Sequence, residues 1–162
     1  MHTVHRTRIA APLEEVFALA RDVEAWPQLL REYRWCRVLE RTPRRLVFAM
    51  GGRIRLWPAR WTAVQEARPE DRRITFRHLS GITRGMEVEW RFAPDGNTVD
   101  VELVHDLTMR WPVIGRLVSD LIVGPIFIQF IARRTLEAVK ARAEAALAGG
   151  PTAGRPAEGE TP

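Results

Sequence analysis

Turn-forming residues divide the middle of this sequence at short, regular intervals. Five clusters separate runs that are rich in Val, Ile, Phe and Trp: Thr42–Pro43, Gly51–Gly52, Arg68–Asp71, Ser80–Gly81 and Pro94–Asn97. The runs predict six strands, over residues 33–41, 45–51, 53–66, 72–79, 84–93 and 98–109. Because such short connections cannot hold the long crossover that parallel neighbours need, consecutive strands should be antiparallel. The sequence therefore predicts an antiparallel meander.

Apolar and polar residues alternate within these predicted strands. Over residues 84–93, one side of the strand holds Met86, Val88, Trp90 and Phe92, and the other holds Glu87, Glu89 and Arg91. This period of two is typical of a sheet that buries one of its faces. The strands over 72–79 and 98–109 repeat the pattern, with His78 and His105 in the apolar series. We therefore expect two histidines on an otherwise apolar face.

A strand over residues 2–9 and two short helices are expected before the meander. Pro12 suits the first turn of one helix, and Asp22 can cap a second helix that Trp26–Pro27 interrupts.

A long apolar run, Trp111–Ile131, follows the meander. It approaches the length of a membrane span, but it contains Arg116 and Asp120. In a membrane span, these two charges would be buried in the hydrocarbon of the bilayer. Gly124–Pro125 should divide this region into helices over 112–123 and 125–147. No transmembrane span is expected, although peripheral contact with a membrane is compatible with this run.

Length and composition indicate a single domain. The 162 residues are 46% hydrophobic, which is enough for one core. We expect a domain over residues 1–148 and a disordered tail over 149–162, where Gly, Pro, Glu and Thr leave little to bury.

Charge and motif content exclude several classes of function. The net charge is +5, but the basic residues are interspersed with Asp and Glu, so we expect no nucleic-acid partner. Cys36 is the only cysteine, which rules out an intramolecular disulfide and a thiolate zinc cluster. Neither a nucleotide-binding loop nor a metal-ligand motif is present, so no cofactor or metal is expected. The first nine residues lack the apolar core of a signal peptide, which predicts a cytoplasmic protein.

The order of the predicted elements indicates a fold. A curved antiparallel sheet with one apolar face and a single long helix rarely fills the space between them, so a cavity is expected there. We predict an α+β, helix-grip fold: about seven strands wrapped around a long C-terminal helix, with two short helices after the first strand.

Three segments resemble a known family. Ile9–Phe17, Asp22–Pro27 and Tyr33 look like the opening of the polyketide cyclase/dehydrase group of START-like (SRPBCC) proteins, and the resemblance spans about residues 3–146. The chain is similar in particular to bacterial aromatase/cyclases and, through its last helix, to coenzyme-Q-binding START-like proteins.

The resemblance implies an internal cavity for a hydrophobic or aromatic ligand, with no metal or nucleotide. In the aromatase/cyclases, an arginine and a tyrosine are thought to assist the folding, aldol closure and dehydration of a poly-β-ketone chain. Tyr33 matches that tyrosine by its position after Trp26–Pro27. Ala67 occupies the position that corresponds to the arginine, with Gln65 and Trp61 inward of it on the same strand.

The strand faces and the resemblance together nominate the site residues. His105 is the first catalytic candidate, because a partly desolvated imidazole can titrate near neutral pH, and Tyr33 is the second. An ordinary hydrogen-bonded core histidine is the alternative for His105, and simple packing is the alternative for Tyr33. The predicted ligand-binding residues are Trp26, Trp61, Gln65, His78, Met86, Trp90, Ile126, Gln129, Phe130 and Arg133.

Gln129 and Arg133 lie one helical turn apart, so they share a face. If that face meets the cavity, they supply polar contacts to the ligand. If it meets water, Arg133 only begins the basic end of the helix.

Three functions remain open at this point. The first is a cofactor-independent aromatase/cyclase or dehydratase that acts on a free or tethered polyketide, with an acyl carrier protein as a candidate partner. The second is a non-catalytic carrier or chaperone of a quinone or lipid. The third, ranked last because no clustered basic patch is evident in the sequence, is a ribosome-associated START-like protein.

Overall fold

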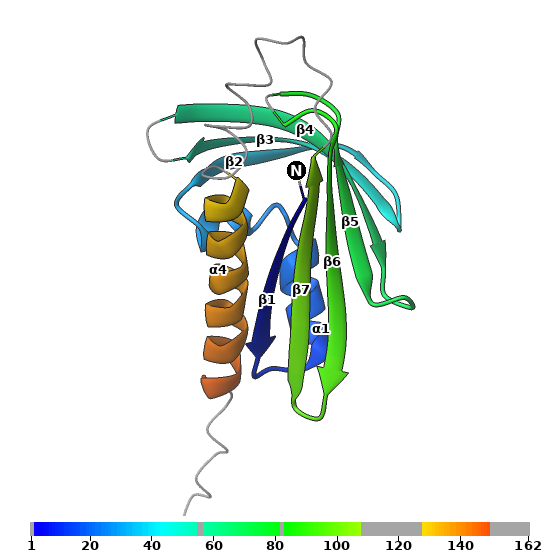
Figure 1. Cartoon of the computed structure of the whole chain (residues 1–162), viewed down its shortest axis with the longest axis vertical. Coiled ribbons are helices and arrows are strands. Elements are labelled where there is room, and N and C mark those ends of the chain that lie inside the picture. Colours follow the sequence, from blue (N-terminus) through cyan, green and yellow to red (C-terminus); the bar gives the residue numbers. More distant parts are fainter. Residues whose placement is uncertain (1, 55–56, 82, 108–127, 150–162) are drawn as a thin grey trace, which may run out of the picture.

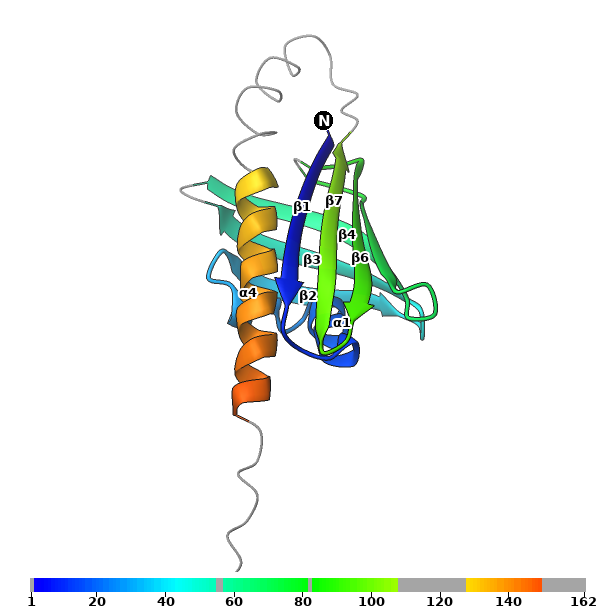
Figure 2. The same ribbon diagram turned by 60° about the horizontal axis from the view of Figure 1, so that its bottom comes forward.

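The computed structural model of this chain describes residues 2–54, 57–81, 83–107 and 128–149. Seven strands of these residues form one antiparallel sheet in the order β1-β7-β6-β5-β4-β3-β2, which curls around the long helix α4 (Figures 1 and 2). The strands are β1 (His2–Ile9), β2 (Tyr33–Arg41), β3 (Arg45–Ile54), β4 (Trp57–Arg68), β5 (Arg73–His78), β6 (Met86–Asp95) and β7 (Thr98–Leu107). The helices are α1 (Leu13–Arg21), α2 (Trp26–Leu29) and α4 (Gln129–Ala148). The predicted helix-grip fold is confirmed.

Pairing of β1 with β7 places the first strand beside the last one. The meander runs from β2 to β7 through neighbours in the sheet, and β1 then adds to β7 in antiparallel register, from His2 opposite Asp106 to Ile9 opposite Val99. The two ends of the domain therefore meet, and α4 lies beside β1 in both views (Figures 1 and 2).

Helix α1 closes the end of the sheet that lies away from the N-terminus (Figure 1). Its apolar stripe buries Val16, Phe17 and Ala20, and the Phe17 ring packs 5.2 Å from the ring of Phe92 on β6. Glu14 and Glu15 lie in the first turn, where the helix dipole favours negative charge.

The structure corrects one predicted turn. Gly51 and Gly52 do not end a strand but continue β3 to Ile54. A Cβ atom on Gly51 would lie 2.2 Å from Nε1 of Trp35, and one on Gly52 would lie 2.7 Å from the carbonyl oxygen of Glu32. These glycines therefore allow Trp35 on β2, and Glu32 before it, to pack closely against β3. In a sequence, a glycine that is needed for close packing cannot be told apart from one that forms a turn.

The connection between β5 and β6 is anchored to β4. The amide nitrogen of Leu79 donates a 2.7 Å hydrogen bond to the carbonyl oxygen of Thr62, and the amide of Thr62 donates to Ser80 Oγ at 3.0 Å. Gly81 has a φ of +84°, and a Cβ atom there would lie 2.1 Å from the carbonyl oxygen of Arg60. Only glycine fits this position, which holds the connection against β4.

Helix α4 is held against the end of β1 and against the turn that precedes β2. Near its C-terminus, Lys140 Nζ donates to the carbonyl oxygen of Arg8, and Glu144 accepts a 3.0 Å hydrogen bond from the amide of Ala10. Near its N-terminus, Arg134 Nε lies 3.2 Å from Glu32 Oε1. These contacts set the side of the helix that faces the sheet.

The predicted helix over 112–123, the Gly124–Pro125 hinge and nearly all of the predicted tail lie outside the described residues. Among the residues that the structure does describe, no helix is long and apolar enough to cross a membrane.

Candidate functional site

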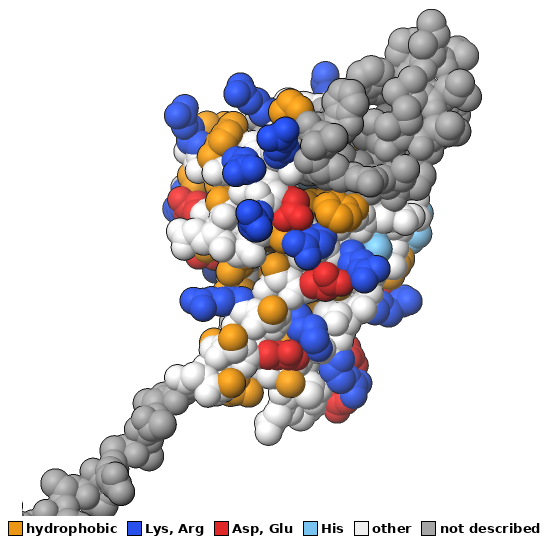
Figure 3. Space-filling view, turned by 90° about the vertical axis from the view of Figure 1, so that its left-hand side faces the viewer, with side chains coloured by type: hydrophobic (Ala, Val, Ile, Leu, Met, Phe, Trp, Pro, Cys, Tyr) orange, Lys and Arg blue, Asp and Glu red, His pale blue; other side chains and the backbone are white. Residues whose placement is uncertain are grey.

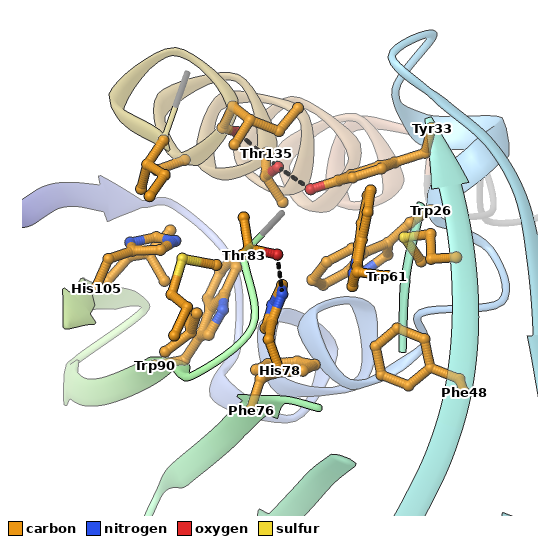
Figure 4. Close-up of a pocket in the computed structure, with 17 residues that line it drawn as sticks. Trp26, Tyr33, Phe48, Trp61, Phe76, His78, Thr83, Trp90, His105 and Thr135 are labelled. Atoms are coloured by element: carbon orange, nitrogen blue, oxygen red, sulfur yellow. Dashed lines mark hydrogen bonds between the residues drawn. The ribbon is translucent and has the colours of Figure 1, made fainter. Parts of the chain in front are cut away.

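A cavity of about 70 Å³ lies between the concave face of the sheet and α4 (Figure 4). Its walls come from α2, from six of the seven strands or their flanking loops, and from the first turns of α4. The described residues that line it are Trp26, Tyr33, Phe48, Met50, Trp61, Phe76, His78, Thr83, Met86, Val88, Trp90, Leu103, His105, Ile128, Ile131, Ala132 and Thr135. None of these side chains is an acid, a lysine or an arginine.

Aromatic rings form most of one wall. Trp26 stacks on Tyr33 with ring centroids 5.5 Å apart, and it also packs at 5.8 Å from Phe76 and at 6.2 Å from Trp90. Trp26 is itself oriented by a hydrogen bond from its Nε1 to the carbonyl oxygen of Leu19. Such flat, apolar walls favour a flat, apolar ligand.

The Tyr33 hydroxyl donates a hydrogen bond to another residue of the protein. Its oxygen lies 2.9 Å from Thr135 Oγ1, and Thr135 Oγ1 donates its own proton to the carbonyl oxygen of Ile131 at 2.8 Å. Thr135 therefore accepts from Tyr33, so the phenol is the donor (Figure 4). Burial raises the pKa of Tyr33 to about 12. The phenol is thus a fixed, neutral group of the wall that can still accept a hydrogen bond from a ligand.

His78 is held by two contacts. Its Nδ1 lies 2.7 Å from Thr83 Oγ1, and its ring stacks on Trp61 with an interplanar angle of 11° (Figure 4). Burial lowers the pKa of His78 to about 4, so it is neutral at neutral pH. His78 therefore links the β5–β6 connection to the aromatic wall.

His105 differs from His78 because its Nδ1 is buried with no hydrogen-bond partner among the described residues. The side chain is 5% exposed and lies beside Trp90 in the cavity wall (Figure 4). Burial, and then the charges of His5 and His78, lower the pKa of His105 to about 3. The pKa therefore does not lie near neutral pH, as the sequence predicted for a partly desolvated imidazole, because the ring is almost fully buried. The imidazole stays neutral at neutral pH and retains both a donor and an acceptor nitrogen.

The structure brings many of the predicted site residues together. Those that line the cavity are His105, Tyr33, Trp26, Trp61, His78, Met86 and Trp90. Their functional roles stay predictions, because position alone does not test them.

Four predicted ligand-binding residues do not line the cavity. Gln65 is buried, but its Nε2 donates a 2.8 Å hydrogen bond to the carbonyl oxygen of Arg21 at the end of α1. Gln129, Phe130 and Arg133 lie on the exposed side of α4, and Arg133 pairs with Glu137. Ile126 lies outside the described residues.

The positions of the residues around the axis of α4 explain why Gln129, Phe130 and Arg133 do not line the cavity. Ile128, Ile131, Ala132 and Thr135 recur at intervals of three and four residues, so they share one face of α4, and that face meets the cavity. Gln129 and Arg133 share the opposite side. Thr83 and Thr135 are polar cavity residues that the sequence predictions did not name. Thr135 follows Ile131 by one helical turn, but the sequence alone does not show that the Ile131 face meets the cavity.

The cavity is smaller than a pocket for a drug-sized ligand, which is typically about 300–1,000 Å³. A ligand of several rings therefore requires the wall to move. Met50 and Met86 line the cavity with unbranched, adaptable side chains that can change rotamer at low cost.

The two buried imidazoles predict how stability responds to acid. Both have folded-state pKa values, about 3 for His105 and about 4 for His78, below the ordinary histidine value of 6.5. Their contribution is thus fully present above about pH 6.5 and is lost as the pH falls towards those values, because the unfolded chain takes up protons first. We expect the free energy of unfolding to fall by about 1 kcal/mol per pH unit for each imidazole between about pH 6 and pH 5.

Urea unfolding at a series of pH values measures this effect. The window lies above the range in which Glu89 and Asp100, whose pKa values are lowered by their arginine partners, begin to titrate. A His105→Gln variant should show a shallower dependence. A wild-type unfolding free energy that is constant from neutral pH to about pH 5 would contradict the buried, neutral state of both imidazoles.

In the described part of the chain, no three or more His, Cys, Asp or Glu side chains form a group that could hold a metal ion.

The family model that matches this sequence and two of its relatives are all named for polyketide cyclases. The family model described as "Polyketide cyclase / dehydrase and lipid transport" matches residues 9–123. The actinorhodin polyketide synthase bifunctional cyclase/dehydratase of Streptomyces coelicolor is 33% identical over 109 residues, which are 64% of this chain and 33% of that protein. This chain therefore spans only about a third of that relative. A Streptomyces halstedii protein that is provisionally named a polyketide cyclase is 32% identical over 121 residues, which are 68% of this chain and 96% of that protein.

Solved structures show the same fold. The Zhui aromatase/cyclase from Streptomyces sp. R1128 superposes with a TM-score of 0.81 at 23% sequence identity, covering 93% of this chain and 98% of that one.

Proposed function

This chain belongs to the polyketide cyclase/dehydrase and lipid transport family, and from that premise we propose that it folds and cyclises a polyketide chain in the cavity under α4. Relatives that share about a third of its aligned residues are named for polyketide cyclisation and dehydration. The observation that carries most weight is the buried imidazole of His105 in an uncharged, aromatic cavity. A chain of linked ketones suits this cavity, since it is neutral, becomes flat on cyclisation and accepts hydrogen bonds.

The reaction assigned here is an intramolecular aldol closure followed by loss of water. A base removes a proton from a methylene group between two carbonyls, and the carbon of the resulting enolate bonds to a distant carbonyl carbon. Neutral His105 has a lone pair for that proton and can return it to the alkoxide oxygen, which becomes a hydroxyl. A second proton is then removed from the same carbon as that hydroxyl leaves, so that a C=C bond forms and one molecule of water is released. The steps balance without an oxidant or cofactor. The aromatic walls contribute by holding the chain in one folded conformer.

Reconstitution tests this function. A minimal polyketide synthase that releases an unreduced chain is incubated with and without the purified protein, and the products are separated by liquid chromatography with mass detection. We expect one regiospecific aromatic product to replace the mixture of spontaneously cyclised ones. An unchanged product distribution at equimolar protein would overturn the assignment.

We further propose that the substrate arrives on an acidic carrier protein, because one region of the outer sheet face carries unneutralised arginines. Residues 33–38, 48–54 and 57–62 of neighbouring strands include no Asp or Glu. Arg37, Arg53 and Arg60 are exposed there and make no ion pair with the described residues, and Trp35 is 38% exposed beside them. We call these four residues the outer arginine patch.

The outer arginine patch lies behind the cavity wall. Arg60 immediately precedes Trp61 on β4, and its carbonyl oxygen contacts Gly81 in the connection that also holds Thr83. Several arginines elsewhere on the outer sheet face are paired, as Arg8 is with Asp100 and Arg91 is with Glu89, whereas Arg77 on β5 makes no ion pair with the described residues. In Figure 3, Lys and Arg side chains gather on the upper part of the face shown, where Asp and Glu are few. Unpaired positive charge next to the cavity favours an acidic partner.

Charge reversal tests the carrier proposal. We expect Arg37→Glu/Arg60→Glu to slow conversion of a carrier-bound polyketide by about tenfold, mainly through weaker association, and to leave a small free thioester analogue unaffected. The matched control is Arg142→Glu, which reverses an exposed, unpaired arginine on α4. Equal losses on the carrier-bound and free substrates, or equal losses for the control, would contradict docking at this patch.

Non-catalytic carriage of a lipid or quinone is the second candidate function, and one observation favours it. Ala67, which aligns with the cavity arginine of the aromatase/cyclases, is buried in the core, and no described residue of the cavity wall is charged. Organic extraction of the purified protein, followed by mass spectrometry, separates the two functions. A stoichiometric lipid or quinone together with no effect on polyketide products would favour the carrier.

A further inference from the structure

Three buried polar atoms beside the cavity have no hydrogen-bond partner among the described residues: Thr3 Oγ1, His5 Nε2 and His105 Nδ1. Buried side-chain polar atoms are nearly always hydrogen-bonded, because an unpaired one costs about 1–3 kcal/mol. Three such atoms close together therefore indicate a partner that they share.

The register of β1 and β7 places the three atoms in one region. Thr3 is directly opposite His105, and His5 is opposite Leu103, so His5 lies diagonal to His105. Paired residues point to the same side of a sheet, and the pair Ile9 and Val99 on this side is in the core. Thr3, His5 and His105 therefore all point into the space between the sheet and α4, which lies beside β1 (Figure 2).

We propose that one ordered water molecule bridges Thr3 Oγ1, His5 Nε2 and His105 Nδ1, and that Thr3 and His5 are positioning residues for His105. A buried water typically makes about three hydrogen bonds to otherwise unsatisfied protein groups. Directly opposed Cβ atoms lie about 5 Å apart and diagonal ones about 7 Å apart, a spacing that a bridging water can span. This water site lies outside the cavity-lining residues, since neither Thr3 nor His5 is among them.

The bridge determines what His105 can do in the cavity. A neutral imidazole has one N–H and one nitrogen with a free lone pair. If the water determines whether Nδ1 carries the proton, it also determines whether Nε2 does. His5 is half-buried on an edge strand, so it provides a path for a proton from His105 through the water to solvent. The groups that act electrostatically on this pair are His78 from β5 and Arg133 from α4. The catalytic part of this inference rests on the proposed function, whereas the water site does not.

Side-chain NMR of ¹⁵N-labelled histidine tests the water site without any substrate. In the wild-type protein we expect one neutral tautomer of His105. In Thr3→Val/His5→Phe, which removes two of the three polar atoms, we expect a mixture of tautomers. The matched control is Thr7→Val, on the same face of β1 but opposite Val101. Thr3→Val alone is the milder variant if the double one is unstable, and Thr3→Ser should restore the wild-type spectrum.

Steady-state kinetics then test the positioning role. We expect kcat of the double variant to fall about tenfold with KM unchanged, because the ligand does not touch Thr3 or His5. A His105 tautomer state that is identical in wild type and double variant would overturn the inference, even if the protein proves to be a cyclase. Conversely, a tautomer change in a protein that converts no polyketide would support the water site and count against the proposed function alone.

Discussion

Replacement of His105 by glutamine is expected to lower the rate of regiospecific cyclisation by about 10²–10³-fold, because the variant loses the group that takes and returns the proton. Glutamine is neutral and of similar size, so the fold should persist, and circular dichroism together with the melting temperature checks this. The rate is measured in the reconstituted synthase assay at saturating substrate.

His2→Gln is the matched control, since His2 is an exposed histidine at the far end of β1, where it pairs with Asp106. A His105→Gln protein that keeps the wild-type rate and product pattern would show that His105 is an ordinary core residue. A proportional loss in both variants would point to a general effect on folding instead.

Replacement of Ala132 by leucine is expected to abolish measurable ligand binding and raise or preserve stability. Ala132 is 2% exposed and lines the cavity from α4. Leucine adds three carbon atoms to a space of about 70 Å³, which leaves little room for a ligand. Filling a cavity commonly adds about 0.5–2 kcal/mol of stability. Loss of binding with a gain of stability distinguishes blockage of the cavity from damage to the fold.

Tryptophan fluorescence titration with an aromatic polyketide measures the binding, and urea unfolding measures the stability. Ala141→Leu makes the same substitution on the exposed side of α4 and should change neither quantity appreciably. Undiminished affinity in a stably folded Ala132→Leu protein would place the ligand elsewhere. A large loss of stability would show that the cavity cannot accept the added side chain.

Alternation in the strands made the sheet face predictable. His78 and His105 were placed on the apolar face from the period of two alone, and both line the cavity. Successive residues of a strand point to opposite sides of the sheet, so the spacing in the sequence shows directly which residues share a side. This inference needs no knowledge of tertiary packing. The fold followed from the same pattern, together with the short connections between strands.

The face of α4 could not be settled in the same way. Residues on both sides of its first turns are apolar, since Phe130 is exposed while Ile131 is buried, so the sequence does not favour one phase. The choice depends on contacts between elements, such as the ion pair of Arg134 with Glu32 and the hydrogen bond of Tyr33 with Thr135. Gly51–Gly52 presents the same difficulty, because close packing and a turn both require glycine.

The sequence pattern also did not predict that β1 pairs with β7. It depends on closure of the sheet by strands about a hundred residues apart, from His2 opposite Asp106 onward. That closure brings Thr3 and His5 behind His105, so a role for the N-terminal strand in the site became visible only in three dimensions.

A crystal structure of the protein with a bound aromatic polyketide product tests the central claim most directly. We predict that the ligand occupies an enlarged cavity between the sheet and α4, in contact with Trp90, His105 and Thr135. Displaced side chains of Met50 and Met86 should account for the added volume. A ligand bound only on the outer surface, or a cavity that remains unchanged in crystals grown at saturating ligand, would contradict the assignment of this cavity as the site of cyclisation.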